Sequence, residues 1–388
     1  MRAIVQVIAA SFWLFSSLAW TQTDTPQARS DVQAQEAPVP IQILIPTPPT
    51  AFRGDTQWRL CYEIYLTNLS SSSWTVRHIE VKNESGAPLL TVQGKELDRV
   101  LSHPALAPGS NTGLAAEIGP GEAVIAYMWI DLVNDAPIPT HLQHQFGLTK
   151  SGDKNNYDLD APMTVVSNKL PEIVSPLRGK NWLAFNGPSN TSLHRRTMIV
   201  LDATPHIAQR YAIDWVQIGD DGESYHGDAK DNRSYHCYGV EARAIADGVV
   251  VEVKDGLPEN TPNAPPVVPI TVETIAGNHV NLDLGGGVYA MYAHLQPGSL
   301  RVKLGDRVTP GQVIGLVGNT GNSSEPHFHF QLMDRNSPLD SEGLPYSLPA
   351  FKVTGRQRSD KPTFDRLAAP ETHHGDLPLE NEMVDFEP

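Results

Sequence analysis

The sequence predicts an all-β protein, in which an immunoglobulin-like β-sandwich is followed by a second antiparallel β domain. The chain has 388 residues, enough for two domains at roughly 100–200 residues each. It contains 30 Gly and 32 Pro, so turns should be frequent and helical bundles are excluded. Hydrophobic residues make up 40% of the chain and charged residues 19%. This is enough apolar material to build folded cores.

Residues 1–19 have the pattern of a secretory signal peptide. An Arg at the second position precedes the apolar run 3–20, and residues 17–19 offer the small side chains that a signal peptidase requires. An uncleaved anchor is the alternative, because this run approaches the length of a bilayer-spanning helix. We expect cleavage and an exported protein, periplasmic or extracellular. Residues 20–40 are polar and rich in Ala, Gln and Pro, and should form a flexible lead-in.

Residues 41–166 consist of short alternating runs separated by turn residues. Leu60–Leu66, Thr75–Val81 and Ala123–Ile130 are three such runs, with Ser-Gly and Pro-Gly pairs between runs. Alternation with a period of two is typical of strands, and this turn spacing is typical of a sandwich. We therefore predict an immunoglobulin-like β-sandwich without catalytic residues, which is a candidate for docking a partner.

Residues 171–353 have the pattern of a small, glycine-rich β domain. Gly248–Val253 and Val280–Leu284 alternate as strands, and Gly285–Gly287 turns the chain back. The segment Val302–Gly318 then has very short strands with Gly at nearly every bend. Such glycine density suits tight corners between crossing sheets.

The charge of the chain is strongly negative. Its net charge of −15 makes nucleic acid an unsuitable partner, since phosphate binding needs a clustered basic face. Beyond Arg366 there are six acidic residues and no Lys or Arg. Residues 355–388 are therefore predicted to be a disordered acidic tail.

Two cysteines lie in different predicted domains. Because the protein is expected to be exported, Cys61 and Cys237 could form a disulfide that joins the domains. They could equally be two buried thiols that act as small hydrophobic residues. The sequence leaves both interpretations open.

The segment Pro326–Phe330 places two histidines on one face of a predicted strand. Side chains alternate along a strand, so His327 and His329 project together while Phe328 and Phe330 enter the core. Two imidazoles in this arrangement can present a metal ligand beside a catalytic base. Two solvated histidines are the simpler interpretation, but further candidate residues stand elsewhere in the domain.

Two of these candidates are His294 and Asp214. His294 stands near the end of the predicted strand Val288–Leu295, where functional groups are common. Asp214 lies in the apolar run Gln209–Trp215. Burying a carboxylate there is costly unless a metal or a histidine satisfies it.

With these residues in view, the stretch from about Gln209 to Met333 resembles the zinc metallopeptidases of the lysostaphin/LytM type, which cleave peptide cross-links of bacterial cell walls. The resemblance rests on blocks in the same order, namely Ala244–Val250, Gly277–Val280, Tyr292–Leu295, Val302–Val308, Gly311–Gly315, Gly318–Gly321 and His327–Phe330. It implies a duplicated hybrid motif of crossed antiparallel sheets, one zinc ion per chain and peptidoglycan cross-link peptides as partner. We expect a monomer.

The resemblance also implies roles for individual residues. Asp214 and His329 match two of the three zinc ligands of the family. His327 and His294 match its catalytic base and transition-state stabiliser. With three protein ligands, a fourth position would stay open for water, as in catalytic zinc sites.

The third ligand departs from the family pattern. The usual His stands four residues before the Asp, where this chain has Arg210, and a guanidinium does not ligate zinc. If Thr197–Leu201 and Ile207–Trp215 form a hairpin centred on residue 204, His194 lies opposite Asp214, within reach of one ion. His206 would lie at the tip, more than about 20 Å from Asp214. We therefore predict His194 as the third ligand. Arg210 would orient a substrate carboxylate or pair with an acid.

Three functional hypotheses follow. The first is a secreted zinc endopeptidase that hydrolyses peptide bonds of peptidoglycan. The second is a catalytically inactive relative that binds wall peptides or activates a partner hydrolase, and Arg210 is its main support. A lipoyl-type carrier domain shares the run of Val302–Gln312 but needs a modifiable Lys on a hairpin tip, and Gly315–Gly321 has no Lys.

Overall fold

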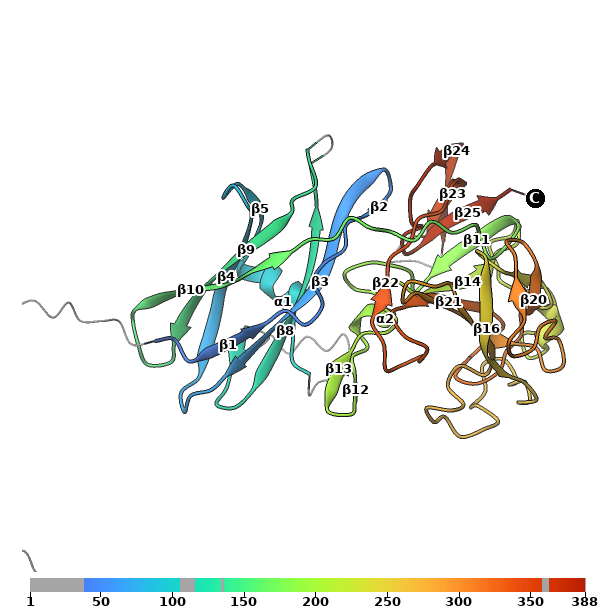
Figure 1. Ribbon diagram of the computed structural model, residues 1–388, viewed down its shortest axis with the longest axis horizontal. Helices are drawn as coiled ribbons and strands as arrows, with labels where there is room; N and C mark the ends of the chain where they lie inside the picture. Colours follow the sequence, from blue (N-terminus) through green and yellow to red (C-terminus); the bar gives the residue numbers. More distant parts are fainter. Residues whose placement is uncertain (1–37, 105–115, 134–135, 358–362, 388) are drawn as a thin grey trace, which may run out of the picture. The chain divides into compact units, whose positions relative to one another are not determined.

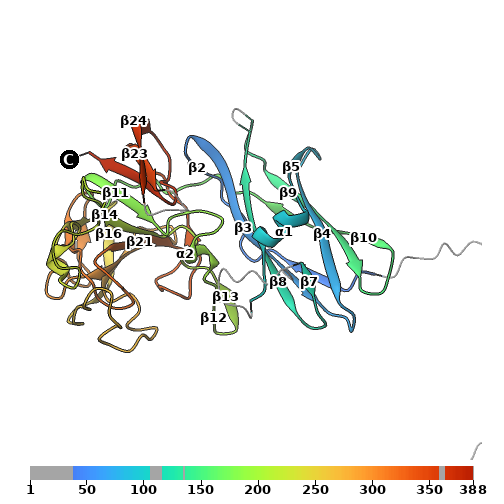
Figure 2. The ribbon, with the colours of Figure 1, turned by 180° about the vertical axis from the view of Figure 1, so that it is seen from behind.

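The computed structural model describes residues 38–104, 116–133, 136–357 and 363–387. The expected signal peptide and most of the expected lead-in lie outside the described residues. Contacts group Val39–Pro388 into one compact unit. The described chain is almost entirely β, which confirms the predicted fold class (Figures 1 and 2). None of its helices has the length and apolar composition needed to cross a bilayer.

The first domain is a sandwich of two antiparallel sheets. One sheet has the order β1-β3-β8-β6, with β2 beside β3, and the other has the order β10-β9-β4-β5, with β7 beside β4. The first sheet contains β1 (Ile41–Leu44), β2 (Phe52–Gly54), β3 (Gln57–Asn68), β6 (Leu101–Ser102) and β8 (Ala123–Asp131). The second contains β4 (Trp74–Asn83), β5 (Pro88–Gln93), β7 (Glu117–Ile118), β9 (His141–Lys150) and β10 (Asn156–Val165). The short helices η1 (Gly94–Glu96) and α1 (Leu97–Val100) connect β5 to β6.

Strand β3 is buried on both faces. Tyr62 and Ile64 point into the sandwich core. Cys61 belongs instead to the core of the second domain, and Tyr65 packs against Met198 of that domain. Because strand side chains alternate, one strand serves both domains, and its residues 61, 63 and 65 face the second one.

The second domain is built on an eleven-stranded sheet with the order β19-β16-β17-β18-β21-β14-β11-β25-β23-β24, with β22 beside β21. Its strands are β11 (Gly179–Phe185), β14 (Ile213–Gln217), β16 (Gly248–Lys254), β17 (Asn278–Asp283), β18 (Tyr289–Leu295), β19 (Arg307–Val308), β21 (Phe328–Met333), β22 (Gly343–Leu344), β23 (Phe351–Gln357), β24 (Phe364–His373) and β25 (Glu382–Phe386). Two small sheets pair β12 (Ile199–Leu201) with β13 (Thr204–His206), and β15 (Glu241–Arg243) with β20 (Val313–Leu316). The one-turn helices are α2 (Leu193–Arg196) and η2 (Asn232–Ser234).

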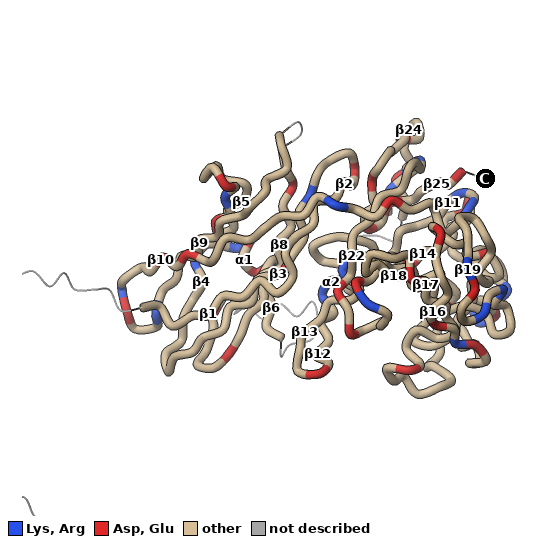
Figure 3. Tube along the Cα trace, viewed as in Figure 1, with Lys and Arg blue, Asp and Glu red and all other residues tan. Residues whose placement is uncertain are grey.

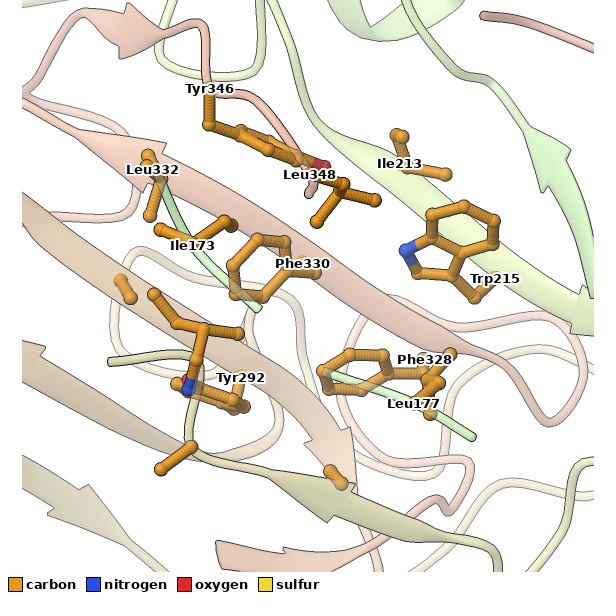
Figure 4. Packing of buried hydrophobic residues seen from close by; sticks show 14 of the residues in the cluster. Ile173, Leu177, Ile213, Trp215, Tyr292, Phe328, Phe330, Leu332, Tyr346 and Leu348 are labelled. Carbon is orange, nitrogen blue, oxygen red and sulfur yellow. The ribbon is translucent and has the colours of Figure 1, made fainter. Parts of the chain in front are cut away.

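The core of this domain lies against the central strands. Phe328 and Phe330 of β21 are fully buried and pack around Tyr292 of β18, at ring-centroid distances of 6.0 and 5.5 Å (Figure 4). The predicted alternation of β21 is therefore confirmed. Since the phenylalanines fill one face of the sheet, the histidines between them lie on the other.

The predicted disordered tail is wrong for the described residues beyond 355. There β24 and β25 join the main sheet, β25 pairs with β11, and Met383 and Val384 are fully buried. The prediction relied on charge composition, but the structure pairs the acids. Asp376 is buried and accepts a hydrogen bond from Nδ1 of His373 at 2.9 Å, and Glu382 lies 3.3 Å from Arg356. The second domain thus extends to Phe386.

Both cysteines are free thiols and buried. Cys61 lies on β3, and Sγ of Cys237 donates a hydrogen bond to the carbonyl oxygen of Pro326 at 3.0 Å. The structure therefore agrees with the interpretation in which each thiol packs as a small hydrophobic side chain.

Candidate active site

Three neighbouring strands bring the predicted site residues together. β14 pairs with β21 so that Asp214 lies directly opposite His329, and β21 pairs with β18 so that Ala293 lies opposite His329. Side chains directly opposite one another on antiparallel strands have Cβ atoms about 5 Å apart. The sheet register therefore places Asp214, His329 and the end of β18, with His294, at one spot.

His194 reaches the same spot from outside the sheet. Its Nε2 lies 3.2 Å from Oδ2 of Asp214. The predicted contact is thus present, but the predicted hairpin is wrong. Residue 194 lies on the one-turn helix α2 and not on a strand. The hairpin of β12 and β13 has only three residue pairs, and its turn is at Asp202 and Ala203 rather than at residue 204. Both turn residues have positive φ, 47° and 61°, as a tight two-residue hairpin requires.

The carboxylate of Asp214 is the centre of the cluster. Its Oδ1 lies 2.8 Å from Nδ1 of His329 and 3.4 Å from Nε2 of His327. Its Oδ2 accepts a hydrogen bond from Nδ2 of Asn186 at 2.9 Å. Asp214 is only 7% exposed, so these neighbours largely replace water around it.

The other ring nitrogen of each histidine has an oxygen partner of its own. Four such contacts are within reach of an N–H donated by the ring: Nδ1 of His194 to O of Ala212 (3.4 Å), Nδ1 of His327 to O of Glu325 (2.9 Å), Nδ1 of His294 to O of Thr320 (2.7 Å) and Nε2 of His329 to Oε1 of Gln331 (2.8 Å). In the neutral tautomers, the remaining nitrogens of His194, His327 and His329 then turn lone pairs toward Asp214. Lone pairs that face a carboxylate repel it unless a cation lies between them.

This donor set fits a metal ion. The ligand atoms of His194, Asp214 and His329 all lie within 4.8 Å of one another, and all three residues are buried. Two imidazoles and one carboxylate form a common zinc ligand set. Metal-binding histidines typically donate their other ring N–H to a carbonyl or a side-chain acceptor, as both rings do here.

The protonation equilibria also favour positive charge at this spot. Burial by itself would raise the pKa of Asp214, but His194 and His327 outweigh it and hold that pKa well below its usual value. Burial opposes charge on His194 and His327, yet the Asp214 carboxylate outweighs it and raises the pKa of both. The space among these groups therefore attracts a cation.

His294 stands at the rim of the cluster in an unusual backbone conformation. Its φ is +61°, although it is not a glycine, and such strain often occurs at functional sites. Its ring centroid lies 4.7 Å from that of His327. Burial, with His327 and His329 adding to it, lowers the pKa of His294 well below the usual value.

A cleft of about 370 Å³ opens over the cluster. All five predicted residues line it: His194, Asp214, His294, His327 and His329. Its other walls are largely apolar and include Phe185, Leu193, Ile275, Met291 and Leu339. The arrangement combines a cluster that fits a cation, two further imidazoles beside it and a cleft that opens over both.

The two alternative basic residues lie elsewhere. Nε2 of His206 lies 2.9 Å from Oδ1 of Asp340, and its Nδ1 lies 3.3 Å from Glu342. Arg210 turns away from Asp214 and pairs with Glu63 at 2.7 Å and with Glu342 at 2.6 Å. Of the two roles expected for Arg210, the structure shows pairing with an acid.

Gln331 and Asn186 are two of the residues that contact the cluster without being among the candidates predicted from the sequence. Gln331 shares the strand face of His327 and His329, so the same alternation could have revealed it. Asn186 follows β11 in a left-handed conformation with φ of +50°. No sequence pattern connects it to Asp214, and only the pairing of Phe185 with Asp214 across β11 and β14 brings it there.

The fold and the cluster define a β domain with a group of histidine and aspartate side chains that fits a metal ion. Residues 235–341 match the model of Peptidase family M23. The matched segment contains His294, His327 and His329 but begins after His194 and Asp214. The resemblance seen in the sequence is therefore confirmed over this segment.

Several characterised proteins are similar over the same region. Glycyl-glycine endopeptidase ALE-1 of Staphylococcus capitis is 38% identical over 118 residues, covering 30% of this chain and 27% of that protein. Peptidoglycan DD-endopeptidase ShyA of Vibrio cholerae is 41% identical over 66 residues, covering 17% of this chain and 15% of that protein. The chain thus spans less than a third of the length of these relatives.

The comparison with solved structures finds, among others, the catalytic domain of lysostaphin from Staphylococcus simulans. The two chains are 22% identical, and the match covers 42% of this chain and 88% of the lysostaphin chain, with a TM-score of 0.24. A zinc-containing peptidase from Vibrio cholerae is 13% identical to this chain. The match covers 78% of this chain and 86% of the peptidase, with a TM-score of 0.23.

Proposed function

We propose that the protein is an exported zinc endopeptidase that hydrolyses peptide bonds of bacterial peptidoglycan. The observation that carries this proposal is the convergence of His194 and His329 on Asp214 at 3.2 and 2.8 Å, beneath an open cleft. The match to Peptidase family M23 and the endopeptidase names of similar proteins support the reaction class.

His194, Asp214 and His329 would hold one zinc ion per chain. In the tautomers that donate to Ala212 and Gln331, the lone pairs of His194 Nε2 and His329 Nδ1 face the carboxylate, so the three ligand atoms would be directed at one point. Zinc bound with an open position supplies an acidified water and polarises a scissile carbonyl.

His327 is placed to take a proton in this reaction. Its Nδ1 lies 2.9 Å from the carbonyl oxygen of Glu325, so Nε2, which lies 3.4 Å from Oδ1 of Asp214, is the nitrogen that would take the proton. A nitrogen with a free lone pair at the cleft is what general base catalysis requires.

His294 is placed to stabilise negative charge on the substrate. Because its Nδ1–H is donated to Thr320, the ring donates from Nε2 only when both nitrogens are protonated. Because burial lowers the pKa of His294, the ring is neutral in the free site, and it would take up the second proton only as negative charge develops on the substrate.

Zinc content and hydrolysis together test this proposal. The purified protein should contain about one zinc per chain, and chelation should abolish hydrolysis until zinc is restored. The names of the relatives suggest two substrates, a pentaglycine peptide and a D,D-cross-linked muropeptide dimer. Asp214→Ala serves as the inactive control because it removes the central ligand.

The outcomes separate the two main hypotheses. Zinc binding with hydrolysis of either substrate supports the endopeptidase. A protein without zinc that sediments with intact peptidoglycan but cleaves neither substrate would support the non-catalytic wall-binding relative instead.

A further inference from the structure

The helix that carries His194 has little to hold it in place by itself. Helix α2 has four residues, and its N-cap residue Ser192 makes no side-chain capping hydrogen bond. Short helices are marginal on their own and depend on tertiary contacts. Besides its own contacts with Ala212 and Asp214, the position of His194 therefore depends on what its neighbours on the helix bind.

Those neighbours are attached to the sandwich domain. Arg195 is completely buried, and its Nε donates to Oε1 of Glu63 at 3.1 Å. Its Nη2 donates to the carbonyl oxygens of Tyr62 and Met128 at 3.0 and 2.8 Å. A planar guanidinium with this many directed bonds fixes the backbone that bears it.

Arg196 adds a second attachment. Its guanidinium lies 4.1 Å from the ring centroid of Tyr127 on β8, and its Nη2 donates to the carbonyl oxygen of Arg99. Basic and acidic positions lie close together around α2 (Figure 3). The two residues that follow His194 thus both bind the sandwich.

The carboxylate of Glu63 also holds the chain that leads to Asp214. Nη2 and Nε of Arg210 donate to Oε2 of Glu63 at 2.7 and 2.9 Å. Glu63 is 1% exposed. Burial alone would raise its pKa, but Arg210 and Arg195 outweigh burial and keep the pKa below its usual value. One charged group therefore bridges α2 and the segment before β14.

We propose that Glu63 and Arg195 are positioning residues of the metal site, so that the sandwich domain is a structural part of that site. The proposal rests on the proposed function, because it takes zinc as the ion. It also accounts for Arg210. The position where the family has a ligand carries a partner of Glu63 instead, and the ligand comes from α2.

The effect should be visible in metal affinity. Ligand atoms must be held within roughly 0.5 Å for tight binding. Glu63→Gln removes the charge shared by both arginines, so α2 loses the ionic part of its attachment and keeps the bonds to Tyr62 and Met128. We expect the zinc dissociation constant to rise by about 10–100-fold, as for other outer-shell partners of metal ligands.

The experiment compares full-length wild type, Glu63→Gln and a matched control, Glu382→Gln. Glu382 is also a buried carboxylate, 2% exposed and paired with an arginine, but it lies on β25 and pairs with Arg356 rather than with α2. Zinc affinity is measured by competition with a chromogenic chelator, and stability by denaturant unfolding of the metal-free proteins. We expect both variants to be less stable and only Glu63→Gln to bind zinc more weakly.

A second variant covers the case in which Glu63→Gln does not fold. Arg195→Lys keeps a positive charge opposite Glu63 but loses the bonds to Tyr62 and Met128, and we expect its zinc dissociation constant to rise by about tenfold. Wild-type affinity in a folded Glu63→Gln or Arg195→Lys variant, or an equal loss in Glu382→Gln, would overturn the positioning role. If the wild type itself binds no zinc, the proposed function has failed instead.

Discussion

Nε2 of His194 lies 3.2 Å from Oδ2 of Asp214, although one residue is on a one-turn helix and the other is in the middle of a sheet. No strand pairing connects them. The contact completes a set of two imidazoles and one carboxylate. Arg210, which stands at the sequence position of the usual His ligand, is not part of this set. The arrangement around this contact leads to three predictions about the site, and the sandwich core leads to a fourth.

The first prediction separates the two histidines of β21. His329→Ala should lose both zinc and activity, because Nδ1 of His329 is one of the three converging ligand atoms. His327→Ala should keep zinc and lose turnover, because this ring is placed to move a proton. Zinc content and initial rates of hydrolysis check both variants. Stoichiometric zinc in His329→Ala would refute the ligand assignment.

The second prediction concerns the third ligand. His194→Ala should lose zinc, whereas His206→Ala should retain it, since His206 faces Asp340 and Glu342. Metal content of the two purified variants is compared with that of the wild type. The assignment is wrong if the zinc loss is found in His206→Ala rather than in His194→Ala.

The third prediction concerns His294. Its replacement by Ala should lower turnover by a factor on the order of 10²–10³, the usual cost of losing one group that stabilises an oxyanion. Zinc content should not change, because His294 is not among the three ligands. Rates on a muropeptide substrate measure the effect. Unchanged turnover would show that His294 only shapes the end of β18.

The fourth prediction is a pH dependence of stability that arises in the sandwich core. Burial lowers the pKa of His144 to about 4, below the value of about 6.5 in an unfolded chain. The unfolded state therefore binds more protons between these values, and stability falls as the pH falls. The loss from this group should be about 2 kcal/mol between about pH 7 and about pH 5.

Denaturant unfolding of the metal-free protein at the two pH values measures this loss. His144→Gln is the control, since it removes the titrating ring while keeping a polar group near the hydroxyl of Tyr62, which lies 2.7 Å from Nε2 of His144. The variant should be less stable near neutral pH and should lose less stability on acidification. Equal losses in the two proteins would contradict a buried neutral His144.

Short-range backbone geometry made part of the site predictable from the sequence. Alternation along β21 separates His327 and His329 from Phe328 and Phe330, because successive side chains in any strand point to opposite faces. Local sequence patterns also predicted the alternating strands of the sandwich and the glycine-rich turns of the second domain. Gln331 was within reach of the same rule.

Charge composition predicted disorder poorly in segments whose acidic residues form ion pairs or hydrogen bonds in the fold. The segment beyond 355 looked disordered because it is acidic, yet Asp376 and Glu382 are paired and Met383 is buried. A count of charges does not show which of them will meet a histidine or an arginine in the fold.

Completion of the site depends on long-range packing. The hairpin that was expected to bring His194 to Asp214 does not extend that far, and the residue after His194, Arg195, pairs with Glu63, which is 132 positions away. Such a pairing results from the packing of two domains. No repeating pattern in the sequence predicts it. The strand geometry near β21 could be predicted because it is local, whereas His194 lies on a short helix whose next residue, Arg195, forms a buried ion pair with a distant segment.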